Sequence, residues 1–287
     1  MPVRLLLPAF LLTGAVLLGC ADGVPLPDTA PPVPEADSSA AAPFDFEHPD
    51  VVIELPDALR EISGLTALPG DLLGAVQDED GLLYVLEPDS GRVVGLHRFA
   101  GSGDYEGVEL WESEVMVLRS DGDLYRFPLP DTLLGQSERD APKLETRLKR
   151  SCDAEGLGAA STRLLIACKE SAGKGMKQHR ALYAYDPDAE AIDAAPAFLL
   201  DLSGDRALRA FKPSAVAVHP DGRVFVLSSV MKAVWVLAPD GATLGRYALP
   251  SVYLPQPEGL TFIGSALFVS SEGRPATLVR FTADPTP

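Results

Sequence analysis

The feature that most constrains the fold of this chain is a short phrase that recurs five times. It reads ISGL, DYEGV, AEGLG, PSAVAV and PEGLTF, and the copies begin at Ile62, Asp104, Ala154, Pro213 and Pro257. Each copy opens an apolar strand, and a second strand follows after a short turn and ends in small polar or charged residues. A third apolar strand follows in most copies. Self-similarity of this kind indicates a repeat fold, in which each copy forms one supersecondary unit.

The spacing of the copies predicts the type of repeat. One residue can be taken as the phrase position of each copy: Ser63, Glu106, Glu155, Ser214 and Glu258. The intervals between these positions are 43, 49, 59 and 44 residues, and a four-stranded propeller blade takes roughly 40 to 50 residues. We therefore predict an all-β protein with the fold of a five-bladed β-propeller, with six blades as the alternative. The longer intervals contain polar insertions at 131–150, 171–180 and 189–212.

The hairpin within each copy determines where polar residues gather. Turn residues such as Asp221-Gly222 join the two strands, so the strands are antiparallel, and the start of the first lies beside the end of the second. First strands line the central channel of a propeller. The phrase positions should thus form a ring at one mouth of the channel. The second-strand ends should form a looser ring on the same face, with Asp78, Glu79, Asp121, Glu170 and Glu272.

The acidic phrase positions predict a metal site. Carboxylates that converge in one ring repel one another, which raises their pKa values, and a divalent cation removes that repulsion. A set of carboxylate, hydroxyl and carbonyl oxygens suits calcium. We predict Glu106, Glu155 and Glu258 as calcium ligands. The secondary metal or channel-mouth candidates are Ser63, Glu79, Asp121, Ser214 and Glu272. Alternatively, the three glutamates cap strand ends or face water, and the glycine after each serves a tight bend.

Three basic residues fall on the same acidic face. Lys169 follows the end of a second strand, while Arg60 and Lys212 precede the first and fourth phrases. An anionic ligand would need positive charge there, so these three residues are anion-binding candidates. The alternative is that each is solvated or ion-paired locally.

The first fifty residues do not resemble a blade. Residues 1–19 have one positive charge and a short apolar run, as a signal peptide does. Leu17-Leu18-Gly19-Cys20 resembles a lipobox, which predicts that Cys20 is lipidated; the alternative is an ordinary secretory signal. Residues 20–50 combine prolines with acids and contain no Lys or Arg, so we expect an extended, disordered tether. The propeller domain is predicted at 51–287, with residues 51–55 as the outer strand of the last blade.

Cys152 and Cys168 should lie near the same end of one hairpin. An envelope location is oxidising and favours a disulfide between them. Two buried free cysteines are the alternative.

The composition excludes several classes of function. With 24 basic and 41 acidic residues the net charge is -17, which argues against nucleic acid and against anionic membrane surfaces as partners. The histidines lie away from the predicted mouth, and no GxSxG, HExxH, P-loop or dinucleotide motif is present. The catalytic residues, if any, are therefore not assigned.

The ordered series of phrases resembles one protein family. ISGL with QDEDGLLYVL, GDYEGVE with VLRSDGDLYRF, EGLG with LLIACKE, KPSAVAVHPDGRVFVLSS, and PEGLTF with LFVSSEG are similar to the SdiA-regulated (YjiK-like) envelope proteins over roughly residues 51–281. The resemblance implies a five-bladed propeller, distantly similar to NHL-repeat propellers, with a calcium site. The family's acidic positions fall on Glu106, Glu155 and Glu258, and Ser63 and Ser214 are its non-acidic members.

These observations predict a lipid-anchored, monomeric cell-envelope propeller that binds calcium and works as a binding or sensing module. The alternative is a calcium-dependent hydrolase of phosphate esters or lactones, by analogy with phytase-like and lactonase-like propellers. A sugar-binding module is less favoured, because Trp111 and Trp235 lie within strand patterns. Ala21 after Cys20 suggests the outer membrane, facing the periplasm or the cell surface. A protein or small-molecule partner is not identified.

Overall fold

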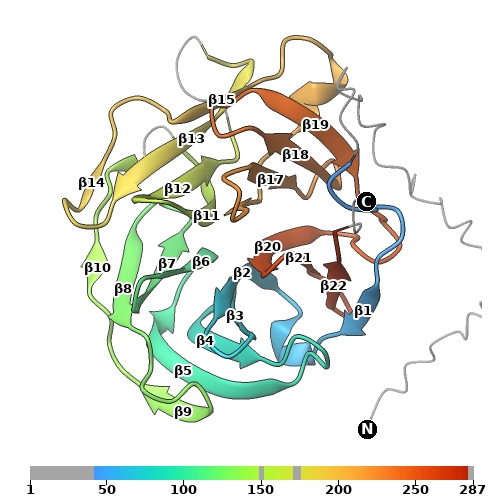
Figure 1. Cartoon of the computed structure of the whole chain (residues 1–287). Helices are drawn as coiled ribbons and strands as arrows, with labels where there is room; N and C mark the ends of the chain where they lie inside the picture. The colour runs from blue at the N-terminus through green and yellow to red at the C-terminus, as the bar shows by residue number, and fades with distance from the viewer. Residues whose placement is uncertain (1–41, 149–151, 171–175, 284–287) are drawn as a thin grey trace, which may run out of the picture.

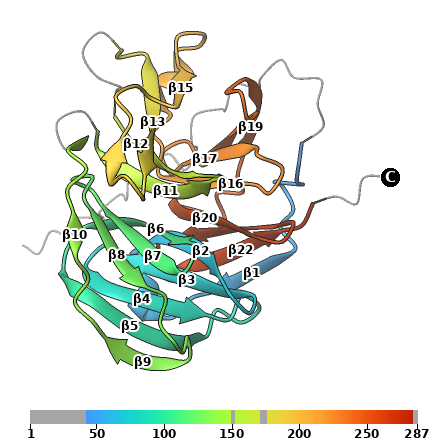
Figure 2. The same cartoon turned by 60° about the vertical axis from the view of Figure 1, so that its left-hand side comes forward.

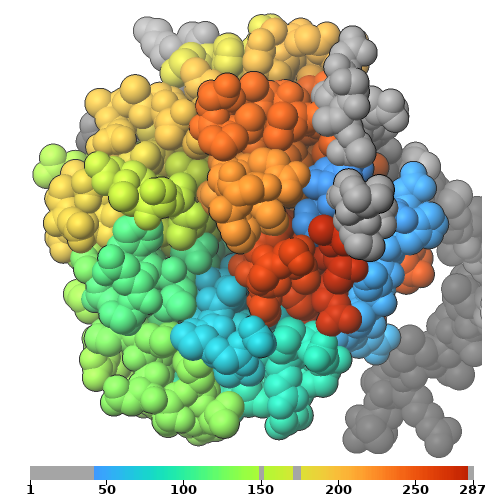
Figure 3. All heavy atoms as spheres, viewed as in Figure 1, coloured from blue at the N-terminus to red at the C-terminus, as the bar shows by residue number. Residues whose placement is uncertain are grey.

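The five predicted blades are confirmed by the computed structural model, which describes residues 42–148, 152–170 and 176–283. Five sheets, antiparallel except for one added edge strand, stand around a common axis (Figure 1). In the same view their atoms meet as coloured sectors around the centre (Figure 3). The helical elements that lie wholly within the described residues are two short 3-10 segments, η1 (Asp57–Leu59) and η3 (Ala207–Ala210). None of these segments is long and apolar enough to cross a membrane.

Each blade begins at the channel and adds strands outward. Blade 1 contains β2 (Ile62–Leu68), β3 (Leu72–Gln77), β4 (Asp80–Leu86) and β5 (Val93–Ser102). Blade 2 contains β6 (Tyr105–Trp111), β7 (Glu114–Arg119), β8 (Leu124–Pro128) and β10 (Lys143–Leu144). Blade 3 contains β11 (Ala154–Ala160), β12 (Arg163–Cys168) and β13 (His179–Asp186), with β14 (Ala191–Ile192) and β15 (Phe198–Asp201) both on β13. Blade 4 contains β16 (Ala215–Val218), β17 (Val224–Ser228), β18 (Ala233–Leu237) and β19 (Thr243–Ala248). Blade 5 contains β20 (Pro257–Ile263), β21 (Ala266–Ser271), β22 (Thr277–Phe281) and β1 (Val51–Glu54).

The ring is closed by strands from the two ends of the domain. β1 pairs antiparallel with β22, in a register that places Val51 opposite Arg280 and Glu54 opposite Thr277. This is the closing strand that the sequence predicted. β16, which carries the fourth phrase, lies between β11 and β20 (Figure 2). The first strands therefore follow one another around the channel in chain order.

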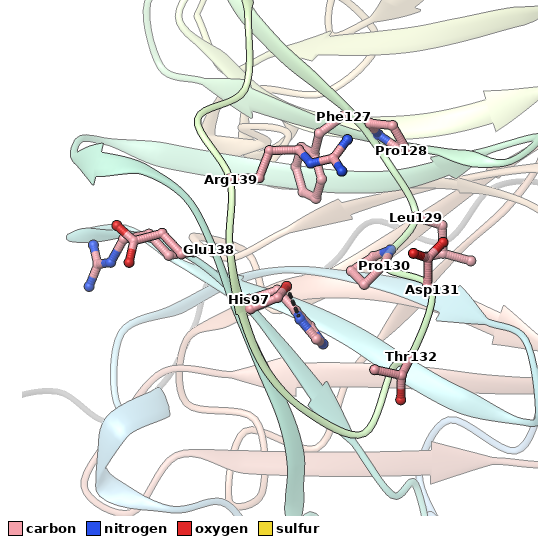
Figure 4. Close-up of a pocket in the computed structure, with 11 residues that line it drawn as sticks. His97, Phe127, Pro128, Leu129, Pro130, Asp131, Thr132, Glu138 and Arg139 are labelled. Carbon is pink, nitrogen blue, oxygen red and sulfur yellow. Dashed lines mark hydrogen bonds between the residues drawn. The ribbon is translucent and has the colours of Figure 1, made fainter.

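The insertion at 131–150 forms a strap over the edge of blade 1. Its strand β9 (Gly135–Glu138) pairs in parallel with β5, and the chain then returns to blade 2 as β10. A side chain at Gly95 would place its Cβ 1.9 Å from the Leu133 carbonyl oxygen. His97 Nδ1 lies 2.7 Å from Ser137 Oγ, and Nε2 lies 3.2 Å from that same carbonyl oxygen. The buried His97 thus fastens the strap, and it lines a pocket between the strap and blade 1 (Figure 4).

Hydrophobic cores fill the five junctions between neighbouring blades. One cluster lies between each adjacent pair, and the cluster between blades 4 and 5 is built on strands β16 to β22. Trp235 is buried in the junction between blades 3 and 4 and packs edge-on against Phe211. It is therefore a core residue and not a platform for a sugar ring.

The packed domain begins earlier than the predicted boundary at residue 51. Phe44 and Phe46 lie in the segment expected to be a disordered tether, yet their exposed fractions are 2% and 4%. Phe44 packs against Phe225 and Phe262, and Phe46 against Tyr247 and Phe281. The two rings fill the junction between blades 4 and 5. They have no sequence period, so only the tertiary structure shows that they are core residues.

We expect Phe46→Ala to lower the free energy of unfolding by about 3–5 kcal/mol, because it leaves a cavity in a core junction. Urea unfolding measures the change. Val252→Ala is the control, since Val252 is 78% exposed and should change stability by less than about 0.5 kcal/mol. Equal stability of the wild type and Phe46→Ala would show that the segment is not part of the domain.

Candidate functional site

The phrase positions share one backbone geometry. In blades 1, 2, 3 and 5 the pairing of the first two strands shifts by one residue, and the unpaired extra residue is the phrase position: Ser63, Glu106, Glu155 and Glu258. In blade 4, Ser214 directly precedes β16 and its N–H donates to the Leu227 carbonyl at 2.9 Å. A bulge re-aims one side chain and interrupts the ladder. Four equivalent bulges therefore mark the channel mouth.

The glycine after each glutamate allows the first strands to approach closely. A Cβ on Gly107 would lie 3.0 Å from Leu157 N in blade 3, and one on Gly156 would lie 2.8 Å from Ala215 Cα in blade 4. A Cβ on Gly259 would lie 3.2 Å from Leu65 N in blade 1. These contacts run between consecutive blades and across the closure of the ring. The glycines are thus needed for packing around the channel.

The second-strand ends lie beside the phrase positions, as predicted. Asp78 N donates to the Glu61 carbonyl at 3.2 Å, Lys169 N to the Asp153 carbonyl at 2.8 Å, and Glu272 N to that of Gln256 at 3.0 Å. The same bond joins Ser120 N to the Asp104 carbonyl in blade 2 at 3.0 Å. The sequence analysis did not select the residues that accept these bonds. Their position two residues before the phrase position is the signal that would have found them: Glu61, Asp104, Asp153 and Gln256.

Lys169 is the cation closest to the three predicted ligands. Its Nζ donates to Glu155 Oε1 at 3.0 Å, and the Glu155 side chain is only 7% exposed. Burial lowers the pKa of Lys169, but attraction to Glu155, then to Glu258 and Glu106, outweighs this effect and raises it. The ammonium group therefore contacts Glu155 of blade 3 and is attracted to one glutamate from each of blades 5 and 2.

Burial and repulsion raise the pKa values of all three glutamates. For Glu106 the causes are burial, then repulsion from Glu155 and Asp104. For Glu155 burial raises the pKa, Lys169 opposes the rise, and Glu258 adds to it. For Glu258 burial raises the pKa, and hydrogen bonding to Ser229 and attraction to Lys169 oppose the rise. One lysine thus offsets only part of the unfavourable charge.

A second acidic group lies where blade 5 meets blade 1. Among the described residues, the acidic side chains with oxygens that all lie within 4.8 Å of one another are Glu61, Asp78 and Glu272. Burial, then repulsion from neighbouring carboxylates, raises the pKa of Asp78 to about 6 and that of Glu272 to about 8. Asp78 Oδ1 is buried without a hydrogen-bond partner. Of this group, only Glu272 was among the metal candidates from the sequence. The predicted ligands Glu106, Glu155 and Glu258 do not form a group whose oxygens all lie within 4.8 Å of one another.

The two serine phrase positions join neighbouring blades. Ser63 Oγ donates to the Tyr105 carbonyl of blade 2 at 2.6 Å, and Ser214 Oγ donates to the Pro257 carbonyl of blade 5 at 3.0 Å. Both serines are 3% exposed. Each hydroxyl proton is therefore donated to the backbone of a neighbouring blade, and the hydroxyl oxygen stays near the channel mouth.

The remaining candidates lie farther out, in local ion pairs. Arg60 lies 3.4 Å from Glu61 and 3.5 Å from the exposed Glu79. Lys212 Nζ lies 2.6 Å from Glu170 Oε1. Asp121 pairs with Arg119 at 3.8 Å. A polar pocket of about 230 Å³, lined in part by Arg60, Glu61 and Glu79, opens beside the second acidic group.

Glu109 is a half-buried carboxylate that the sequence analysis missed. Its Oε1 accepts from Thr66 Oγ1 of blade 1 at 2.8 Å, and its Oε2 accepts from Ala159 N of blade 3 at 3.2 Å. Burial raises its pKa to about 7, and these hydrogen bonds oppose the rise. It lies three residues after Glu106 on the same strand, and the equivalent residues of other blades are small or neutral: Thr66, Gly158, Ala217 and Thr261.

A disulfide fastens the hairpin that carries Lys169. Cys152 and Cys168 are bonded, with their Cα atoms 5.0 Å apart. Cys168 ends β12 directly before Lys169, and Cys152 lies three residues before Glu155. The bond therefore holds both members of the Lys169–Glu155 ion pair near one another. Cys20, the predicted lipidation site, lies outside the described residues.

Comparison with known proteins supports the fold. No protein-family model and no curated protein matches the sequence. The PQQ-bound aldose sugar dehydrogenase from Streptomyces coelicolor is a similar solved structure, with TM-score 0.50 and 13% identity over 89% of this chain and 100% of that one. A structure described as a putative gluconolactonase has TM-score 0.50 and 15% identity over 80% and 78% of the two chains. At such identities the similarity shows the β-propeller fold alone, and the resemblance to SdiA-regulated proteins stays a prediction.

We expect Gly156→Ala to destabilise the protein by about 1–3 kcal/mol, because the new Cβ meets the backbone of blade 4 and overpacks the channel wall. Thermal unfolding measures the effect. Gly204→Ala is the matched control, since nothing lies within 4 Å of a Cβ at that position. Equal destabilisation by both substitutions would contradict the packing role of Gly156.

Glu109 should make the protein less stable as pH rises. Its folded pKa of about 7 lies above the unfolded value of 4.5, so its favourable contribution is complete below pH 4.5 and is lost as pH rises through 7. The predicted loss is on the order of 3 kcal/mol. Urea unfolding from pH 5 to 8 should show a smaller decline in Glu109→Gln than in the wild type or in the exposed control Glu138→Gln. Parallel pH profiles for all three proteins would contradict this.

Proposed function

We propose that this protein is a cell-envelope propeller that binds calcium at the channel mouth and works as a binding or sensing module. The observation that carries the proposal is the convergence of buried and half-buried carboxylates from four blades at one mouth, where Lys169 pairs with Glu155 and Arg60 pairs with Glu61. Carboxylates gathered in this way are expensive to hold together unless a cation lies among them.

The chemistry of the side chains fits calcium. The mouth offers carboxylate and hydroxyl oxygens, and calcium takes six to eight oxygen ligands in a flexible geometry. The buried Asp78 Oδ1 lacks a partner, which a metal ion would supply. The residues that would hold an ion are the predicted glutamates around Lys169 or the neighbouring acidic group: Glu106, Glu155, Glu258, Glu61, Asp78 and Glu272.

An envelope location agrees with the disulfide and with the N-terminal sequence. Disulfides persist in oxidising compartments, and Cys152 and Cys168 are bonded. The lipobox-like Leu17-Leu18-Gly19-Cys20 supports a lipid anchor, and the resemblance to SdiA-regulated proteins supports the same placement. We extend the proposal to a monomer anchored at the outer membrane through Cys20, with no nucleic-acid partner.

A second candidate function is calcium-dependent hydrolysis of lactones or phosphate esters. The polar pocket beside Glu61 offers room for a small ligand next to the acidic group. Calcium would supply Lewis acidity there, and a carboxyl group that titrates near neutral pH suits general acid or base catalysis. One similar structure is described as a putative gluconolactonase. Turnover of lactones or phosphate esters by the calcium-loaded protein, absent with chelator, would favour this function over binding alone.

The proposed function is tested by titrating the full chain with calcium, and with magnesium for comparison. Calorimetry measures the binding, and thermal unfolding measures the change in stability. Calcium at about 100 times its dissociation constant should add about 2.7 kcal/mol of stability. Protons should be released on binding, because metal ligands must be deprotonated. Glu258→Gln should weaken binding at least about tenfold by removing a ligand charge.

His219→Ala is the control for this titration. His219 follows β16 at the opposite end of the first strand and packs against Phe262. The calcium affinity of the His219→Ala variant should equal that of the wild type, even if the stability of the variant differs. The same unfolding midpoint for the wild type in calcium and in chelator would defeat the proposal.

A further inference from the structure

We propose that Lys169 is an internal cation that holds the place of the calcium ion, so that the ammonium group and the ion exclude each other at the mouth. This inference rests on the proposed function and names a device that sets the calcium affinity of the same site. Lys169 would leave the glutamates when the ion binds and return when the ion dissociates.

The position of the ammonium group is the first step of the argument. Lys169 Nζ lies 3.0 Å from Glu155 Oε1. Glu155, Glu258 and Glu106, in that order, are the acidic groups that attract it. These are the three residues that the sequence predicted as calcium ligands. An ion bound by them would lie beside the same oxygens, where a second positive charge is repelled.

The position of Lys169 in the repeat is the second step. The second-strand ends that correspond to it in other blades are acidic or neutral: Asp78, Ser120, Ser229 and Glu272. The other cations near the mouth have different carboxylate partners, because Lys212 pairs with Glu170 and Arg60 pairs with Glu61 and Glu79. In the described part of the mouth, Lys169 is thus the basic residue directed at the predicted ligands.

The attachment of Lys169 allows its side chain to move while its backbone stays in place. The backbone is held by the bond from Lys169 N to the Asp153 carbonyl and by the adjacent disulfide. The side chain is 36% exposed, and a lysine carries its charge on a flexible four-carbon stem. The ammonium group can therefore move into water without unfolding the hairpin. Its departure costs the ion pair with Glu155, which lowers calcium affinity.

The experiment compares the calcium affinity of full-length variants by isothermal titration calorimetry. Lys169→Met keeps the length of the side chain but removes the charge, and it should bind calcium at least about tenfold more tightly than the wild type. Lys169→Arg keeps the charge and should stay close to the wild type. Lys143→Met is the matched control, because Lys143 forms a comparable pair with Asp123 at 2.8 Å on blade 2 and should leave the affinity unchanged.

A second variant guards against a folding defect. Lys169→Ser introduces the residue that blades 2 and 4 carry at the equivalent place, Ser120 and Ser229, and should reproduce the gain in affinity. Without calcium, both charge-removing variants should unfold at a lower temperature than the wild type, because Glu155 loses its partner.

The outcomes separate this inference from the proposed function. Tighter binding by Lys169→Met and Lys169→Ser supports the internal cation. Calcium binding by these variants but not by the wild type supports the internal cation and overturns the proposed function, because the ammonium group then replaces the ion in the native protein. Equal affinity in the wild type and both variants overturns the inference while leaving the calcium site in place. No binding by any variant overturns both.

Discussion

The close approach of the first strands around the channel is the constraint on which the site depends. Gly107 and Gly156 leave no room for a side chain between consecutive blades, so the bulged residues beside them gather at one mouth. The close packing of the strands therefore determines how near the acidic side chains lie to one another. A propeller with larger residues at these glycines could not bring Glu106 and Glu155 so near each other, and the pKa values of both would be less perturbed.

Three different arrangements limit the repulsion between carboxylates that this packing creates. In blades 1 and 4 the phrase position is a serine, which bonds the backbone of the next blade and adds no charge. In blade 3 Lys169 supplies a positive charge to Glu155. At the junction of blades 5 and 1, the ion pairs among the described residues involve Arg60, which Glu61 shares with Glu79. This leaves Asp78 Oδ1 buried without a partner, so the second acidic group has the strongest remaining need for a cation.

The sequence predicted what depends on repetition and missed what depends on contacts between repeats. Five phrases at nearly regular spacing identify the blades, the closing strand and the phrase positions, because each follows from local pattern and from propeller geometry. Glu61 and Glu109 were missed because a charged residue beside or within an apolar strand reveals its burial only when neighbouring blades are placed. Phe44 and Phe46 were missed because two aromatic residues among prolines and acids have no period. The composition of that segment predicted disorder, and tertiary packing overrode it.

The second acidic group lies beside the blade in which the ring is closed, so an ion bound there would act on that closure. Glu272 belongs to blade 5, in which the two ends of the domain pair as β1 and β22, and Asp78 belongs to blade 1, which follows β1 along the chain. Repulsion between their carboxylates acts across this junction, whereas β1 on β22 and the core of the same junction hold it together. An ion shared by the two blades would convert that repulsion into attraction. Calcium would then stabilise the contact between blade 1 and the blade in which the ring is closed, so a change in ion occupancy would change how firmly these two blades are held together.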